Sequence, residues 1–381
     1  MEKVKTGIDN IDEYMDVFKG KRVGLITNNT GYNSDFKSTI DILRKKTNLT
    51  ALYSPEHGIR GDIQAGEKVE SYIDSKTGIR VYSLYGKNRR PSKEILKDVD
   101  VLAFDIQDVG ARFYTYLYTM SYAMESCSEF NKEFVVFDRP NPINGNDVEG
   151  NILNENYSSF VGRYPIPQRY GLTIGEIASL FNEEFSIGAA LKVIPLKNWK
   201  REMYYEDTGL NFIMPSPNMP TIDTAVVYPG TCIFEGTNIS EGRGTTRPFE
   251  IIGAPWLDGF KIADKMNSLQ LCGVKFRPVF FTPTFSKHSG KLCEGVQIHV
   301  TNRKAYKSVK TGIFLYETIK YESKDKFEFI TFEGKKLRYG IDCLAGDNSL
   351  RAANMDTNKI YEKWQEDSLS FKKLKQKYHL Y

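Results

Sequence analysis

The stretch VDVLAFDIQD, residues 99–108, decides the fold class of this chain. It is a short apolar run that ends abruptly in polar residues. Runs of the same kind lie at residues 22–27, 50–53, 79–84 and 134–137, and residues 36–46 and 114–130 have helical spacing between them. Short apolar runs that alternate with helices are typical of a parallel sheet covered on both faces. The sequence therefore predicts an α/β fold for the first part of the chain.

Polar side chains follow these strands at the point where each strand ends. Right-handed crossovers bring the carboxyl ends of parallel strands to one edge of the sheet, and open α/β sheets bind ligands outside that edge. We therefore expect a site there, built from Asn28, Glu56, His57, Asp105, Gln107, Asp108, Asp138, Arg139 and Asn141.

The chain changes character at MPSPNMP, residues 214–220, where three prolines in seven residues predict an extended, rigid loop. We place a domain boundary just after it, at Val226. The remainder has strand-like runs at 295–300 and 327–332 and helical spacing at 256–270 and 305–321. The prediction is an α/β domain over residues 1–226 and a smaller α+β domain over residues 227–381 that completes the cleft.

Composition narrows the class of protein. With 52 Lys plus Arg against 48 Asp plus Glu, the net charge is only +4, which does not favour a nucleic-acid partner. The five widely spaced cysteines form no CxxC motif, so neither a disulfide framework nor a zinc site is expected. Charged residues follow Met1 and no run approaches 18 apolar residues, which predicts a cytoplasmic chain without membrane insertion. A natural precursor with a signal peptide would instead be secreted or associated with the cell wall.

Aromatic residues make up 13% of the chain. Most are expected in the core, as for Phe104, Phe134, Phe137, Phe181 and Phe185, which lie in apolar patterns. Tyr114, Tyr116, Tyr164 and Tyr170 lie in or after polar segments that follow strands, and they are predicted to line a groove for a flat ligand such as a sugar ring.

Several catalytic motifs are absent from the sequence. There is no GxGxxG after the first strand, no P-loop, no HExxH and no GxSxG. What remains is carboxylate chemistry, carried by Glu56, Asp105, Asp108, Asp138, Glu241 and Glu250. Paired carboxylates suit glycoside hydrolysis and also divalent metal binding, and spacing alone does not separate the two.

Six ordered motifs resemble the exo-β-N-acetylmuramidases of bacterial cell-wall turnover, formerly a domain family of unknown function. They are SPEHGIRG at 54–61, DIQDVGARFYTY at 105–116, DRPNP at 138–142, PSPNMP at 215–220, EGRGTTRPFE at 241–250 and GVQIHV at 295–300. The resemblance implies a Rossmann-like first domain that binds no dinucleotide and a reaction without cofactors. It also implies a glycoside hydrolase that removes N-acetylmuramic acid (MurNAc) from the non-reducing end of peptidoglycan fragments. Its partners would be saccharides of MurNAc and N-acetylglucosamine (GlcNAc), or muropeptides.

The resemblance implies roles for single residues. Glu56 is the candidate general acid, with pairing to Arg60 as its structural alternative, and His57 is a candidate to orient it or to bind the sugar. Asp105 and Asp108 are candidates for the second carboxylate or for sugar recognition. Arg112 is a candidate to bind the lactyl carboxylate of MurNAc, with Arg243 and Arg247 as rivals. The remaining candidates for substrate binding are Arg60, Tyr114, Tyr116, Asp138, Arg139, Asn141, Asn218, Glu241 and Glu250.

Two other functions stay open on sequence. One is a metal-dependent hydrolase that uses Asp105, Asp108 and Asp138. The other is a saccharide-binding protein that has the groove without the chemistry.

Overall fold

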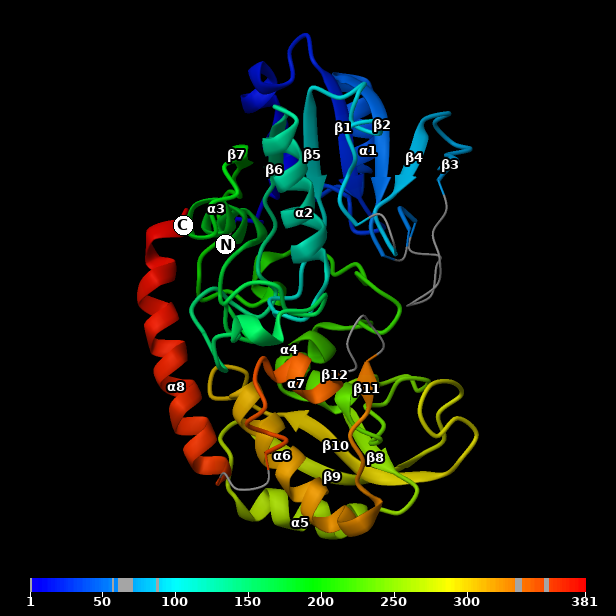
Figure 1. Cartoon of the computed structure of the whole chain (residues 1–381), viewed down its shortest axis with the longest axis vertical. Coiled ribbons are helices and arrows are strands. Elements are labelled where there is room, and N and C mark those ends of the chain that lie inside the picture. Colours follow the sequence, from blue (N-terminus) through cyan, green and yellow to red (C-terminus); the bar gives the residue numbers. More distant parts are fainter. Residues whose placement is uncertain (1, 57, 61–70, 87–88, 333–337, 353–355) are drawn as a thin grey trace.

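The first part of the chain forms a doubly covered, mostly parallel sheet (Figure 1). The structure, a computed structural model, describes residues 2–56, 58–60, 71–86, 89–332, 338–352 and 356–381. The sheet has the strand order β3-β4-β2-β1-β5-β6-β7, and only the β3–β4 pair is antiparallel. The strands are β1 (Arg22–Thr27), β2 (Asn48–Ser54), β3 (Tyr72–Ile73), β4 (Arg80–Ser83), β5 (Val101–Asp105), β6 (Glu133–Phe137) and β7 (Ala190–Ile194). The predicted α/β fold is confirmed.

Strand β5 shows why these runs fold as buried strands. All five of its residues are buried, and successive side chains point to opposite faces. Leu102 and Phe104 pack on the face covered by helices α2 (Tyr116–Glu129) and α3 (Ile174–Glu184). Val101 and Ala103 pack on the other face. That face is covered by the 3-10 helix η1 (Gly7–Val17) and helix α1 (Thr39–Lys46).

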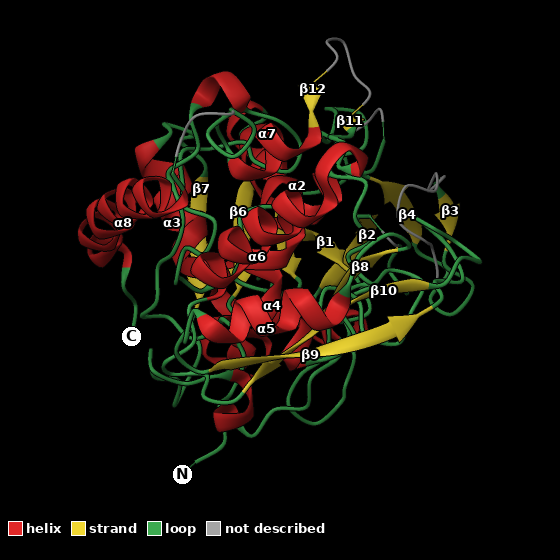
Figure 2. Ribbon diagram, turned by 90° about the horizontal axis from the view of Figure 1, so that it is seen from below, coloured by secondary structure: helices red, strands yellow, loops and turns green. Residues whose placement is uncertain are grey.

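The second part of the chain is an antiparallel sheet packed with helices (Figure 2). Its strand order is β8-β10-β9, from β8 (Ile251–Ala254), β9 (Val274–Phe281) and β10 (Cys293–Val300). The helices are α4 (Ile222–Thr231), α5 (Gly259–Ser268), α6 (Ser308–Ser323) and α7 (Gly340–Ala345), and β11 (Thr331–Phe332) pairs with β12 (Arg338–Tyr339). Short 3-10 helices lie at η2 (Glu155–Tyr157), η3 (Tyr205–Thr208), η4 (Cys232–Gly236), η5 (Lys324–Lys326) and η6 (Lys375–Tyr378). Of the strand predicted at 327–332, only Thr331 and Phe332 form a strand, and Phe329 makes an isolated β-bridge to Thr237.

The predicted boundary after Val226 falls inside α4, which packs against α6 of the second part. The division at that residue stays a prediction. Helix α8 (Thr357–Leu374) runs along the side of the molecule and brings the C-terminus back to α3 (Figure 1). There the Tyr381 hydroxyl donates to Asp138 Oδ2 at 2.6 Å. Among the described helices, none combines the length and apolarity that a membrane span requires.

Two glycines set the distance between α4 and α6. A Cβ on Gly312 of α6 would lie 2.0 Å from the carbonyl oxygen of Gly230 in α4, and a Cβ on Gly230 would lie 2.0 Å from the carbonyl oxygen of Ser308. The two backbones therefore approach more closely than any other residue permits.

We predict that Gly312→Ala destabilises the protein, although alanine is the better helix former by about 1 kcal/mol. The added methyl group must push α6 away from α4, and we expect the free energy of unfolding to fall by about 2 kcal/mol or more. Urea unfolding followed by circular dichroism measures this. Glu317→Ala, an exposed change in the same helix, is the control. Equal stability of the two variants would contradict the packing argument.

Candidate active site

One cavity lies where the carboxyl ends of the parallel strands face the second part of the chain. Residues from both parts line it: Glu56, Tyr85, Phe113, Tyr114, Thr115, Tyr116, Phe160, Val161, Ser216, Asn218, Tyr228, Glu235 and Arg243. Glu56 follows β2, residues 113–116 follow β5, and residues 216 and 218 belong to the proline-rich loop. This is the edge at which an open α/β sheet binds its ligand.

Glu56 enters the cavity as a partly buried carboxyl group with one fixed oxygen. The Thr115 hydroxyl donates to Oε2 at 2.9 Å, and no described residue donates to Oε1. Arg60 does not pair with Glu56, because its guanidinium is bound to Asp74 at 2.8 Å. His57 lies outside the described residues.

The wall beside Glu56 is aromatic. The Tyr114 ring meets the rings of Tyr116 and Tyr228 edge to face, at centroid distances of 5.1 and 6.0 Å. Tyr116 donates to the carbonyl oxygen of Pro215 at 2.7 Å, which ties the loop after β5 to the proline-rich loop. Burial raises the pKa of both Tyr114 and Tyr116 above the ordinary value, so both stay neutral.

A row of four charges ends at the cavity, where Arg243 and Glu235 belong to the lining. Arg243 Nε contacts Glu235 Oε1 at 3.2 Å and Glu241 Oε1 at 3.3 Å, and Lys287 Nζ contacts Glu241 Oε2 at 2.7 Å. Burial opposes the charge of Arg243, but the two carboxylates raise its pKa above the ordinary value. The Arg243 and Glu235 side chains are each 23% exposed, whereas that of Glu241 is 2% exposed. Glu241 therefore supports the row from inside.

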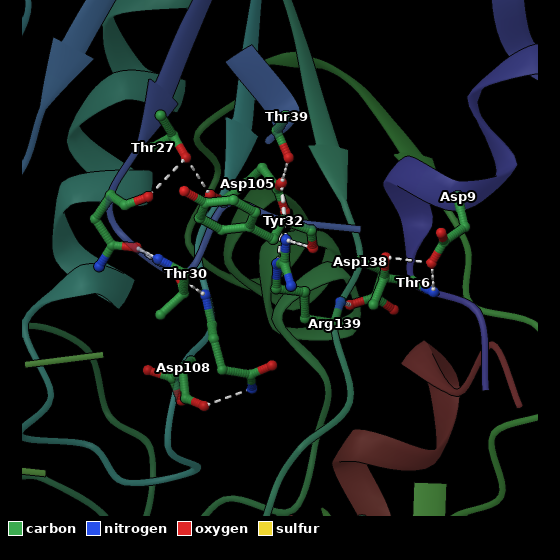
Figure 3. Close-up of polar contacts among 12 residues, drawn as sticks. Thr6, Asp9, Thr27, Thr30, Tyr32, Thr39, Asp105, Asp108, Asp138 and Arg139 are labelled. Atoms are coloured by element: carbon green, nitrogen blue, oxygen red, sulfur yellow. Dashed lines mark hydrogen bonds and ion pairs between the residues drawn. The ribbon is translucent and has the colours of Figure 1, made fainter. Parts of the chain in front are cut away.

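Asp105 is not in the cavity, so its predicted catalytic role is not supported. It is 0% exposed at the end of β5. Its two oxygens accept from Arg139 Nε at 2.6 Å and Nη2 at 2.9 Å, and the Thr39 hydroxyl also donates to it (Figure 3). This buried pair lies between β1 and β5, where the strand order reverses, and Arg139 does not line the cavity beside Glu56.

Asp108 is buried beneath the cavity wall and does not line it. The Gly110 amide donates to Oδ2 at 2.6 Å and the Tyr170 hydroxyl donates to the same atom, while Oδ1 has no described partner. Burial raises the pKa of Asp108 to about 7. Asp108 therefore shapes the turn before Tyr114. Tyr170 and Tyr164, which were predicted in the groove, lie in the core.

Asp138 and Asn141, which were predicted to bind substrate, are also internal and do not line the cavity. Asp138 accepts from the Gly175 amide at 2.7 Å, the Thr173 hydroxyl at 2.8 Å and Tyr381, and so joins the start of α3 to the C-terminus. Asn141 donates to the carbonyl oxygen of Leu172 at 2.9 Å. Among the described residues, no three His, Cys, Asp or Glu side chains group as metal ligands would.

Arg112, which was predicted to bind a substrate carboxylate, is fully buried and does not line the cavity. Nη1 donates to the carbonyl oxygens of Asn151 and Ile166, both at 2.8 Å. Nη2 donates to those of Leu344 at 3.0 Å and Ala345 at 2.8 Å. Burial lowers the pKa of Arg112 to about 10, which leaves it charged at neutral pH. Arg112 joins the two parts of the chain.

The remaining residues predicted to bind substrate lie partly in the cavity lining and partly outside it. Asn218 lines the cavity. Glu250 accepts from the Thr224 hydroxyl at 2.7 Å at the start of α4, and Arg247 contacts Glu250 at 3.1 Å outside the cavity. Glu235 was not predicted, because its segment, CIFEG at 232–236, resembles an ordinary apolar stretch. The only signal was its place a few residues before the motif that begins at Glu241.

The comparisons with known proteins cover the whole chain. The family model for the N-terminal domain of exo-beta-N-acetylmuramidase NamZ matches residues 23–223, and the model for its C-terminal domain matches residues 226–381. Peptidoglycan beta-N-acetylmuramidase NamZ of Bacillus subtilis (strain 168) is 52% identical, over 100% of this chain and 92% of that protein. Two crystal structures of DUF1343 family proteins from Bacteroides fragilis also match. One has a TM-score of 0.90 and 39% identity, the other a TM-score of 0.80 and 32% identity, and each match covers 100% of this chain and 99% of that chain.

We predict that Arg112→Lys lowers the free energy of unfolding by about 3 kcal/mol, because one ammonium group cannot satisfy four buried carbonyl oxygens. Arg247→Lys, at a half-exposed side chain, should stay within about 0.5 kcal/mol of the unchanged protein. Thermal and urea unfolding of both variants measure the difference. If Arg112→Lys proved as mild as Arg247→Lys, Arg112 would not be the joint described above.

Proposed function

This chain belongs to the exo-β-N-acetylmuramidase family, and we propose that it removes β-linked MurNAc from the non-reducing end of peptidoglycan fragments in the cavity beside Glu56. The observation that carries the proposal is the joint presence of Glu56, an aromatic wall and the Arg243 guanidinium around one cavity. In this proposal Glu56 protonates the leaving oxygen, the aromatic wall contacts the sugar ring, and Arg243 binds the lactyl carboxylate of MurNAc.

Glu56 acts as the general acid. Thr115 holds Oε2, which leaves Oε1 to carry the proton toward the glycosidic oxygen. Glu56 gives that proton to the leaving oxygen as the C1–O bond breaks. A water molecule adds to C1, and the proton that this water releases returns through solvent to Glu56 and restores the acid. The net reaction consumes one water molecule and yields free MurNAc and a shortened saccharide.

Arg243 binds the lactyl carboxylate. Three arginines were predicted as candidates to bind the lactyl carboxylate. Arg112 donates its four hydrogen bonds to backbone carbonyl oxygens, and Arg247 lies outside the cavity. Arg243 lines the cavity, and its Nη1 makes no hydrogen bond to a described residue. A guanidinium fork matches a carboxylate in geometry as well as in charge.

We predict that Glu56→Gln lowers kcat on a chromogenic MurNAc glycoside by about 10²-fold or more, because the amide has no proton to give. Its unfolding temperature should stay close to that of the unchanged protein. Glu155→Gln, an exposed change on η2, is the matched control and should keep full activity. Turnover by Glu56→Gln near that of the control would reject Glu56 as the acid.

We also predict that the protein hydrolyses a β-MurNAc glycoside far faster than the matching β-GlcNAc glycoside. The two substrates differ by the lactyl group, so the ratio of their kcat/KM values reports recognition of that group. Arg243→Met should reduce the ratio, and it should raise KM for the MurNAc glycoside. Equal rates on both glycosides with the unchanged protein would sink the proposed specificity.

A further inference from the structure

The cavity contains a second carboxylate, that of Glu235. Its charge is neutralised by Arg243, the residue that we propose binds the lactyl carboxylate of the substrate. Glu235 contacts Arg243 through Nε at 3.2 Å and also through Nη2. Among the described residues that line the cavity, Glu56 and Glu235 are the only carboxylates. A glycoside hydrolase needs two, because positive charge develops at C1 as the bond breaks. A carboxylate bound to a guanidinium stabilises that charge poorly.

The row of four charges indicates which carboxylate partner of Arg243 a substrate carboxylate can replace. Lys287 and Arg243 are positive and Glu241 and Glu235 are negative, so the row is balanced without substrate. A bound lactyl carboxylate adds one negative charge beside Arg243. Glu241 cannot leave, because it is almost completely buried and also holds Lys287. Lys287 in turn donates to the carbonyl oxygens of Phe234 at 2.7 Å and Ile239 at 2.9 Å. Glu235 is the partner that is accessible to solvent.

We infer that the lactyl carboxylate of MurNAc displaces Glu235 from Arg243, and that the freed Glu235 becomes the second carboxylate facing C1. The inference rests on the proposed function. Its consequence is that recognition and rate are coupled: a sugar with the lactyl group releases Glu235, whereas a sugar without it leaves Glu235 bound to Arg243. Glu235 then contributes its negative charge to the transition state of MurNAc substrates only, so discrimination appears in kcat as well as in KM.

The test uses a substrate without the lactyl group and adds a carboxylate as a separate small molecule. With the unchanged protein and the chromogenic β-GlcNAc glycoside, sodium propionate at about 0.1 M should occupy Arg243 and raise kcat by roughly tenfold, a step of about 1.4 kcal/mol. Propionamide, of the same shape without charge, and sodium chloride at equal ionic strength are the controls and should have no such effect. With the MurNAc glycoside, propionate should instead compete and raise KM.

Two variants complete the test. Glu235→Gln should lower kcat on the MurNAc glycoside by about 10²-fold and lose the response to propionate, whereas Glu235→Asp should recover part of both. Arg243→Met releases Glu235 without a carboxylate, so it should raise kcat on the GlcNAc glycoside above that of the unchanged protein and make it insensitive to propionate.

The outcomes distinguish failure of the proposed function from failure of the proposed displacement of Glu235. No preference for the MurNAc glycoside overturns the proposed function, and the exchange with it. A clear preference without stimulation of GlcNAc hydrolysis by propionate overturns the exchange alone, as does Glu235→Gln with nearly unchanged kcat on the MurNAc glycoside. The propionate experiment uses the unchanged protein, so it decides even if a Glu235 variant fails to fold.

Discussion

The site depends on the buried guanidinium of Arg112, which binds four backbone carbonyl oxygens and holds the two parts of the chain together. No carboxylate pairs with it in the described structure. Two of the four oxygens belong to the last residues of α7, where the helix dipole is negative and favours a cation. The cavity is lined by residues from both parts of the chain, so this joint helps to set the distance across it.

The sheet could be predicted from the sequence because the burial of a strand is a local pattern. The run at 99–104 is apolar on both of its faces, and the observed strand, β5, begins two residues later and ends at Asp105. The edge that carries the cavity could also be predicted, because the handedness of crossovers is fixed by the chirality of the chain. Both inferences need only the order of residues.

The roles of the polar residues at that edge could not be predicted in the same way. Asp105 ends one strand and Glu56 follows another. Asp105 binds Arg139, which follows β6, whereas among the described residues the Glu56 carboxyl group accepts a side-chain hydrogen bond only from Thr115. Which carboxylate finds a guanidinium depends on contacts between segments that are far apart in the sequence. The same is true of Arg112 and Arg243, which are both arginines in glycine-containing motifs. One is buried among carbonyl oxygens and the other reaches the cavity.

The aromatic residues connect the two chemical ends of the cavity. Tyr114 meets Tyr228 at 6.0 Å, Tyr228 meets Phe249 at 4.7 Å, and the Arg243 guanidinium lies 5.2 Å from the centre of the Phe249 ring. Thr115, next to Tyr114, binds Glu56. A continuous path of edge-to-face rings therefore runs from the loop that fixes the acid to the cation that we assign to the lactyl group. Rings packed in this way have few alternative rotamers, so the acid and the cation are held at a set separation before substrate binds. Preorganisation of this kind lets binding energy at the lactyl group act on the bond that breaks.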